Sequence, residues 1–274
     1  MQLILLLGGT VVLSGCGKEF SSNIGTVRFG PVEEALLKVE AVVSTVEGFK
    51  ASGKCKLVYY DEGKKHKESF SCKMWVLSPD KIRFQGDVVF NPRGLDVGSN
   101  GSEFWVGMKP RELGNVYFWG LWSDQGEFDR LKLDPRMMLD GLGILSLDRD
   151  LVWEVADAGR CDVLLAKTAG GAVIKKLYFD DELRLARIEY YDSGGRPAVT
   201  SELSYTGKRK IQVPARVRIE THFGDESDFS LEVKIGSAKL YEFDEKKRRV
   251  FFGRREPRGY KEVYQVIGGK LLEQ

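Results

Sequence analysis

GFKASGKCKLVYYDEGKKHKESFSCKMWV, residues 48–76, alternates apolar and polar side chains on both sides of a short turn. Alternate positions from Phe49 to Tyr59 are small or apolar, and most positions between them are Lys or Ser. The apolar alternation resumes after the turn, over residues 70–76. A period of two places each set of side chains on one face of a β-strand. We therefore expect a β-hairpin with Gly63-Lys64 as its two-residue turn.

Two cysteines lie on the arms of this hairpin. If Glu62 pairs with Lys65, Cys55 lies opposite Cys72 on a non-hydrogen-bonded rung, where Cα atoms approach to about 4.5 Å. A disulfide accepts that separation. The sequence therefore predicts a Cys55–Cys72 disulfide and leaves Cys161 as a buried free thiol. The alternative is that Cys161 pairs with one of the other two.

The same alternation continues along the chain. It predicts further strands at residues 82–90, 104–108, 115–122, 162–168, 172–180, 184–192, 198–206, 213–223 and 229–240. Helical spacing of apolar residues predicts a helix over residues 31–46, and Pro135 begins a second, short one that ends at glycines. Evenly spaced short strands predict a mainly β chain, in which one antiparallel meander curls into a sandwich or a barrel.

The N-terminal segment MQLILLLGGTVVLSG, residues 1–15, is apolar and uncharged. It is shorter than the roughly 20 residues that span a bilayer, and it ends on small residues as a secretory signal peptide does. The stretch Leu13-Ser14-Gly15-Cys16 resembles a bacterial lipobox. That resemblance implies cleavage before Cys16, acyl chains such as palmitate on Cys16, and a lipidated tether over residues 16–30. The alternative is an ordinary secretory leader with an accidental cysteine.

Charge and motif content weigh against several classes of function. Lys and Arg number 42 and Asp and Glu 40, so a net charge of +2 gives no global nucleic-acid signature. The chain has two histidines and carries no Gly-x-Ser-x-Gly, His-Glu-x-x-His or phosphate-loop motif. Clusters of His and Cys suited to a metal ion are absent from the sequence. We expect no enzyme activity, no cofactor or metal, and no nucleic-acid partner.

The segment KKRRVFFGRREPRGYK, residues 246–261, is basic with interleaved aromatic residues. One interpretation is a membrane-surface strip that meets anionic lipid headgroups. Its candidate residues are Lys246, Lys247, Arg248 and Arg249. The alternative is a solvated hairpin beside neighbouring acidic residues.

Several segments, in this order, resemble the Lol-type lipoprotein carrier and receptor superfamily (LolA and LolB). They are the helix at 31–46 running into GFKASGKCKL, then SPDKIRFQG (78–86), SNGSEFWVGMKP (99–110) and DPRMMLDGLGIL (134–145). The resemblance implies a single strongly curved antiparallel sheet, an unclosed β-barrel, over residues 31–252. It implies an N-terminal helix and a short helical lid on the concave side, and a cavity that accepts acyl chains. Residues 253–274 then form a basic C-terminal extension outside the family pattern.

The candidate cavity lining consists of apolar residues from the strands and from the lid. These are Phe84, Val88, Phe90, Phe104, Val106, Met108, Met138, Leu142, Val217 and Ile219. The alternative is that they pack against one another as a solid core.

Together, these features predict a lipid-anchored protein of the bacterial cell envelope, at the outer membrane facing the periplasm. Its partners would be the membrane, through the acyl chains of Cys16, and a lipid or acylated protein that it carries or receives. The alternative is an envelope structural or stress-sensing lipoprotein that binds a protein partner without carrying lipid. A hydrolase with a site assembled from distant residues is a weaker third hypothesis.

Overall fold

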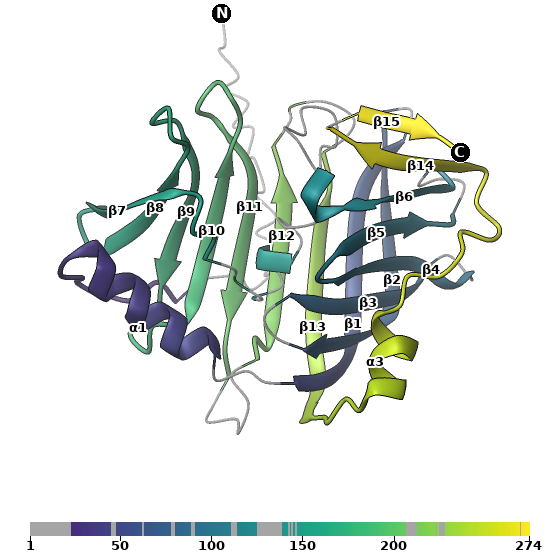
Figure 1. Ribbon diagram of the computed structural model, residues 1–274, viewed down its shortest axis with the longest axis horizontal. Coiled ribbons are helices and arrows are strands. Elements are labelled where there is room, and N and C mark those ends of the chain that lie inside the picture. Colours follow the sequence, from purple (N-terminus) through teal and green to yellow (C-terminus); the bar gives the residue numbers. More distant parts are fainter. Residues whose placement is uncertain are drawn as a thin grey trace, which may run out of the picture.

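The strands form one curved sheet. The computed structural model describes residues 23–44, 48–61, 63–77, 80–88, 91–110, 114–124, 139–141, 143, 145, 147–206, 213–222, 224, 228–268 and 270–274. Within them, 15 strands follow the order β15-β14-β6-β5-β4-β3-β2-β1-β13-β12-β11-β10-β9-β8-β7. The two edge strands, β15 and β7, lie at opposite ends of that order, so the sheet stays unclosed (Figure 1). Mainly β structure in one strongly curved sheet is thus confirmed.

The first group of strands is a meander of consecutive neighbours, and the second group repeats this arrangement. The first comprises β1 (Gly48–Asp61), β2 (Lys64–Leu77), β3 (Lys81–Val88), β4 (Asn91–Asn100), β5 (Glu103–Met108) and β6 (Val116–Leu121). The second comprises β7 (Val152–Asp157), β8 (Asp162–Lys167), β9 (Val173–Phe179), β10 (Leu185–Tyr191), β11 (Pro197–Ser204), β12 (Arg216–Thr221) and β13 (Ser230–Leu240). Antiparallel pairing of β1 with β13, from Phe49↔Leu240 to Val58↔Ser230, joins the two groups.

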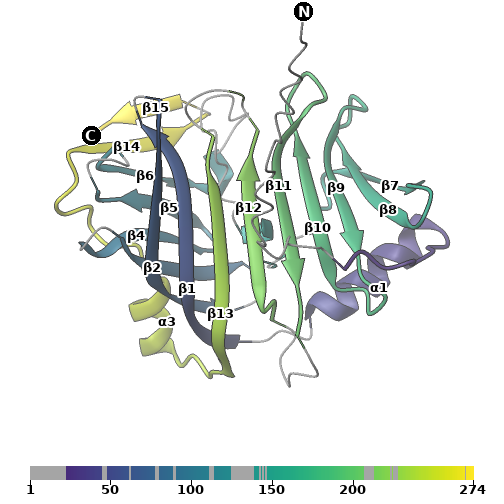
Figure 2. The same ribbon diagram turned by 180° about the vertical axis from the view of Figure 1, so that it is seen from behind.

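The sheet folds over at β2. This strand pairs with β1 along its whole length, but with β3 only over residues 72–77. Strand β3 therefore continues only the second half of β2, and β3 to β6 run across β1 and β2 (Figures 1 and 2). Gly86 permits the close approach at this corner, because a Cβ there would lie 2.5 Å from the ring of Phe70. The inner faces of both parts therefore share one apolar interior.

The hairpin forms with a register two residues away from the predicted one. Asp61 pairs with Lys64, so Gly53 lies opposite Cys72 and Cys55 lies opposite Phe70. The expectation that Glu62 pairs with Lys65 is wrong. A β-bulge between Ser52 and Gly53 on the β13 side shows that this strand is locally irregular.

The predicted N-terminal helix appears as α1 (Val32–Ser44), with Glu33 and Glu34 in its first turn. Acidic side chains there favour the positive end of the helix dipole. Ala35 and Val39 on its buried face pack into the interior beside β7, whereas Leu37 on the opposite face is exposed. Of the predicted second helix, residues 139–141 are helical, and residues 131–138 lie outside the described part of the chain.

The C-terminal segment is a part of the same fold. It forms α3 (Glu245–Phe252), which covers the outer face of β3 and β4, and then β14 (Glu262–Ile267) and β15 (Lys270–Glu273) (Figure 1). β14 pairs with β6 in parallel, from Glu262↔Val116 to Val266↔Gly120. The solvated-hairpin interpretation of residues 246–261 is wrong, because Asp244 caps a helix by accepting a hydrogen bond from the Lys247 amide at 2.8 Å.

Candidate functional site

The inner face of the sheet gathers six of the predicted lining residues into one apolar interior. Phe84 and Val88 lie on β3, Val106 and Met108 on β5, and Val217 and Ile219 on β12. Met108 is half-buried against this core, and the other five are no more than 7 % exposed. Alternation along each strand explains why these residues share one face. Strands that are more than 100 residues apart in the sequence thus contribute to the same interior.

Four predicted lining residues stand apart from this group. Phe104 is fully buried and lies 4.8 Å, ring centroid to ring centroid, from Trp122 of the 3-10 turn η2 (Trp122–Asp124). Phe90, Met138 and Leu142 lie outside the described residues. In the structure, the described lining residues are buried in one apolar interior.

The short helical segment at residues 139–141 is held to the inner face by buried polar contacts. The Nζ atom of Lys175 on β9 lies 2.9 Å from Oδ2 of Asp140, and the hydroxyl of Tyr190 on β10 donates a hydrogen bond to the same oxygen. Lys175 is 6 % exposed and Asp140 3 %. The hydroxyl of Ser201 on β11 donates to the Gly141 carbonyl at 2.7 Å. We call Asp140, Lys175 and Tyr190 the polar latch.

Sequence reasoning did not single out the polar latch, although a signal was present. Val173, Leu177 and Phe179 occupy one face of β9 by alternation, and Lys175 falls on that same apolar face. A charged side chain at such a position requires a partner, since burying a lone charge is costly. Within the described residues, Asp140 supplies the opposite charge.

The two hairpin cysteines both face the interior as reduced, buried thiols. Although they are not opposite each other, Cys55 and Cys72 lie within hydrogen-bonding reach, and this contact together with burial raises the pKa of the Cys55 thiol. Cys161 is also buried and reduced. A disulfide between Cys55 and Cys72 stays a prediction, and nonreducing peptide mapping of the purified protein checks it.

The four basic residues predicted to meet a membrane lie on or beside the first turns of α3, and three have local partners. Lys247 forms an ion pair with Asp244 at 3.1 Å, and Arg249 forms one with Glu245 at 2.7 Å. Arg248 donates from Nε to the Phe243 carbonyl at 2.8 Å, and Lys246 is exposed. These acidic neighbours offset part of the positive charge of this helix.

Comparison with solved structures shows which type of fold the chain has. A LolA superfamily protein from Nitrosomonas europaea superposes with a TM-score of 0.50 and 13 % identity, over 80 % of this chain and 97 % of that one. A DUF1329 family protein from Desulfovibrio piger gives a TM-score of 0.51 and 14 % identity, over 77 % of this chain and 94 % of that one. The chain thus has a LolA-like fold.

Sequence comparisons add no closer relative. No protein-family model matches the chain, and no curated protein matches it by sequence. None of the helices in the described residues has the length and apolar character needed to cross a bilayer. Groups of three or more His, Cys, Asp or Glu side chains that could hold a metal ion are not found within the described ranges.

Proposed function

We propose that this protein binds a lipid, or the acyl chains of a lipid-modified protein, in the apolar interior of its curved sheet, as a carrier or receptor of the cell envelope. The LolA-like fold supports a carrier-like role without catalysis. The observation that carries the proposal is the continuous apolar interior to which β3, β5 and β12 contribute, and to which Leu139 of the segment at residues 139–141 also belongs. Transfer of an acyl chain from water to such a surface contributes about 0.8 kcal/mol per buried CH₂ group.

Entry of an acyl chain requires the segment at residues 139–141 to move away from the interior, and the polar latch controls that motion. In the state described, Asp140 holds residues 139–141 against β9 and β10. Opening would separate Asp140 from Lys175 and leave both polar groups to water. An acyl chain would then replace the contacts that residues 139–141 make with the interior in the closed state.

Anchoring belongs to the same proposal. Cys16, in the part of the chain outside the described residues, would carry the acyl chains after cleavage of residues 1–15, and several chains together hold a protein at a membrane where one alone does not. The anchor would place the protein in the bacterial envelope, at the outer membrane facing the periplasm. Fractionation of Cys16→Ala tests this, since the variant should leave the membrane fraction. Retention in that fraction would refute the anchor.

A photoreactive fatty acid tests the interior directly. The full-length protein is irradiated with a diazirine fatty acid, digested and mapped by mass spectrometry. We expect labels on inner-face peptides that contain Val106, Val217 or Ile219. Labels restricted to outer-face residues such as Trp75 and Trp119, or no labels on residues 23–274, would rule out acyl binding in the interior.

The polar latch provides a matched pair of variants for the same experiment. Lys175→Met removes the buried charge that holds Asp140, and it should raise inner-face labelling several-fold. Lys176→Met changes the next lysine along β9, which points to the outer face and lies 5.1 Å from the ring of Tyr191, and it should label as the wild type does. Equal labelling of the two variants would remove the polar latch from the proposal.

The alternative function is an envelope structural or stress-sensing lipoprotein that binds a protein partner and carries no lipid. The tight burial of Phe84, Val88 and Val217, each no more than 1 % exposed, favours it. A solid interior of this kind would give no acyl labelling in either Lys175→Met or the wild type. The labelling experiment therefore separates the two functions.

A further inference from the structure

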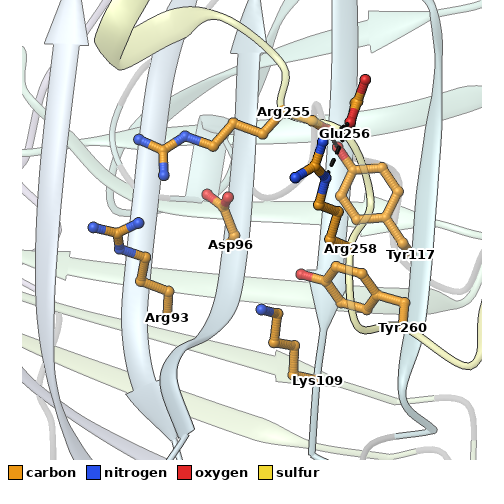
Figure 3. A pocket seen from close by; sticks show the side chains of 8 residues that line it. All are labelled: Arg93, Asp96, Lys109, Tyr117, Arg255, Glu256, Arg258 and Tyr260. Atoms are coloured by element: carbon orange, nitrogen blue, oxygen red, sulfur yellow. Dashed lines mark hydrogen bonds and ion pairs between the residues drawn. The ribbon is translucent and has the colours of Figure 1, made fainter.

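A second site lies on the outer face of the sheet, on the opposite side from the interior. A pocket of about 530 Å³ opens between β4, the end of β5, β6 and the segment after α3. Its lining comprises Arg93, Asp96, Lys109, Tyr117, Arg255, Glu256, Arg258 and Tyr260 (Figure 3). This volume exceeds that of a single small ion and suits a group attached to a larger molecule.

The wall formed by residues 254–260 is held in place by several contacts. Arg254 lies over the ring of Trp119 at 3.9 Å and pairs with Glu103 at 3.0 Å. The Tyr117 hydroxyl donates to the Arg255 carbonyl at 3.3 Å. Tyr260 packs directly on β5, where a Cβ on Gly107 would lie 2.3 Å from its hydroxyl. The pocket is therefore preorganised, and no side chain of β5 obstructs Tyr260.

The charges in the pocket do not balance. The Asp96 carboxylate is neutralised by Arg83, which is 1 % exposed and donates to it from Nε at 3.0 Å as well as from Nη2. Glu256 pairs with Arg258 at 2.7 Å. Among the described residues, no carboxylate forms an ion pair with the remaining cations, Arg93, Lys109 and Arg255. The pocket therefore holds an excess of positive charge.

The cations lie close enough to disfavour one another. Burial and then the charges of Arg83 and Arg93 lower the pKa of Arg255 from its usual value. Figure 3 shows the guanidinium groups of Arg93 and Arg255 on the same side of the Asp96 carboxylate. Burial, chiefly, raises the pKa of Tyr260 to about 12, so its hydroxyl remains a hydrogen-bond donor at neutral pH. Such a group of cations and donors is stabilised by an anion.

The backbone at Arg93 adds an independent observation. Arg93 has a φ of +56°, in the left-handed region that favours glycine, and its amide donates to Asp87 Oδ1 at 2.9 Å. Side chains other than glycine are strained in this conformation. Glycine at position 93 would relieve the strain but would remove the guanidinium group from the pocket.

We propose that this pocket binds a phosphate group carried by a larger molecule. Arg93 and Arg255 provide planar donor pairs that match two phosphate oxygens, and Lys109 and the Tyr260 hydroxyl provide further donors. The phosphate belongs either to a lipid headgroup or to a soluble organophosphate. Because this site lies on the outer face, it does not depend on acyl binding in the interior.

Two probes distinguish the sources of the phosphate. Glycerol 3-phosphate is titrated by calorimetry, and vesicles of phosphatidic acid are sedimented with the protein, with phosphatidylcholine vesicles as the blank. All proteins are full length and carry Cys16→Ala, so that no acyl anchor holds them to a vesicle. Binding to both probes or to either one supports the site, and binding to vesicles alone assigns the phosphate to a headgroup. Binding to neither probe overturns the proposal.

Matched variants locate the binding. Lys109→Gln/Arg255→Gln removes two pocket cations and should weaken binding at least about tenfold. Lys246→Gln/Arg249→Gln removes the same charge from α3 and should bind as the parent does. If the α3 variant loses binding and the pocket variant keeps it, the pocket proposal is wrong and α3 is the anion-binding surface.

Arg93→Gly separates a binding role from a structural one. Since glycine relieves the left-handed backbone, this variant should melt at a higher temperature than the parent and yet bind the phosphate probe several-fold more weakly. Unchanged affinity in Arg93→Gly would remove Arg93 from the site. If the double pocket variant also kept its affinity, the proposal would be overturned.

Discussion

Buried charges on individual residues decide how firmly the segment at residues 139–141 is held to the inner face of the sheet. Asp140 and Lys175 form an ion pair in an apolar interior, with Tyr190 on the same carboxylate oxygen. Removing one member of a buried pair costs more than the pair contributes, because the other charge remains in a poorly solvated place. Sequence alternation could place Lys175 on the inner face. It could not identify Asp140 as the partner, because the two residues meet only after the sheet has folded.

The first prediction concerns Asp140→Asn. The substitution keeps the shape of the side chain but removes the charge that faces Lys175, so the free energy of unfolding should fall by about 3–5 kcal/mol. Urea denaturation measures this change. Lys176→Met on the outer face is the control and should shift stability by less than about 1 kcal/mol. If Asp140→Asn lowered the free energy of unfolding by less than about 1 kcal/mol, the Asp140–Lys175 pair would not be what holds residues 139–141 in place.

The second prediction concerns the pH dependence of an ion pair between β12 and β13. Glu232 lies 2.6 Å from Arg216 and 3.3 Å from Lys234. Burial raises the pKa of the Glu232 carboxyl, but the hydrogen bonds and charges of Arg216 and Lys234 outweigh it, so the pKa lies below the ordinary value of 4.5. A depressed folded-state pKa contributes stability above pH 4.5, and that contribution is lost as the pH falls through the folded-state pKa.

Glu232→Gln should therefore be less stable than the wild type at pH 7, by about 1 kcal/mol for a partly exposed pair. The difference should shrink as the pH falls below 4.5. Thermal melts of both proteins between pH 7 and pH 2.5 measure it. A difference that stays constant across this range would contradict the assignment.

Individual strands show what alternation can and cannot reveal. Most strands were predicted from a period of two, but β4, β7, β14 and β15 were not. In β4, Pro92, Gly94 and Gly98 interrupt the pattern. Gly98 has a packing role, since a Cβ there would lie 2.2 Å from Cζ2 of the buried Trp105. The register of the hairpin was also predicted wrongly. Alternation does not fix which residues form the turn, and a different choice of turn residues shifts every pair on the two strands.

The third prediction follows from this close approach. Gly98→Ala should destabilise the protein by about 1–3 kcal/mol, because neither Trp105 nor the adjacent β3 backbone has room to move. Gly236→Ala on β13 is the control, since the nearest atom to its added Cβ would be the Ser52 carbonyl oxygen at 3.7 Å. The control should change stability by less than about 0.5 kcal/mol. Equal effects in the two variants would show that Trp105 does not restrict position 98.

The fold as a whole depends on contacts between distant parts of the chain. β1 pairs with β13, and β14 reaches back to pair with β6, with Val266 fully buried. The resemblance to Lol-type proteins predicted the curved sheet and the two inner helices. It did not predict that the C-terminal segment would cover the outer face and complete a pocket there, because that segment lies outside the family pattern.

The fourth prediction tests the boundary that sequence analysis drew after residue 252. Truncation at Phe252 would remove β14 and β15 and uncover Tyr117, which now packs 5.0 Å from Tyr260. We expect this variant to lose several kilocalories per mole of stability and to expose apolar surface. Differential scanning calorimetry with the full-length chain as reference checks it. An unchanged melting temperature would show that residues 253–274 are a separable extension.

Whether the interior accepts an acyl chain is measured most directly by mass spectrometry of lipids extracted from purified full-length Cys16→Ala. That variant lacks Cys16, the proposed acylation site, so acyl species in the extract are bound noncovalently. We predict acyl species at up to about one molecule per protein, displaced by the photoreactive fatty acid that labels the inner face. A correctly folded protein that contains no acyl species and takes up no added fatty acid would contradict acyl binding in the interior.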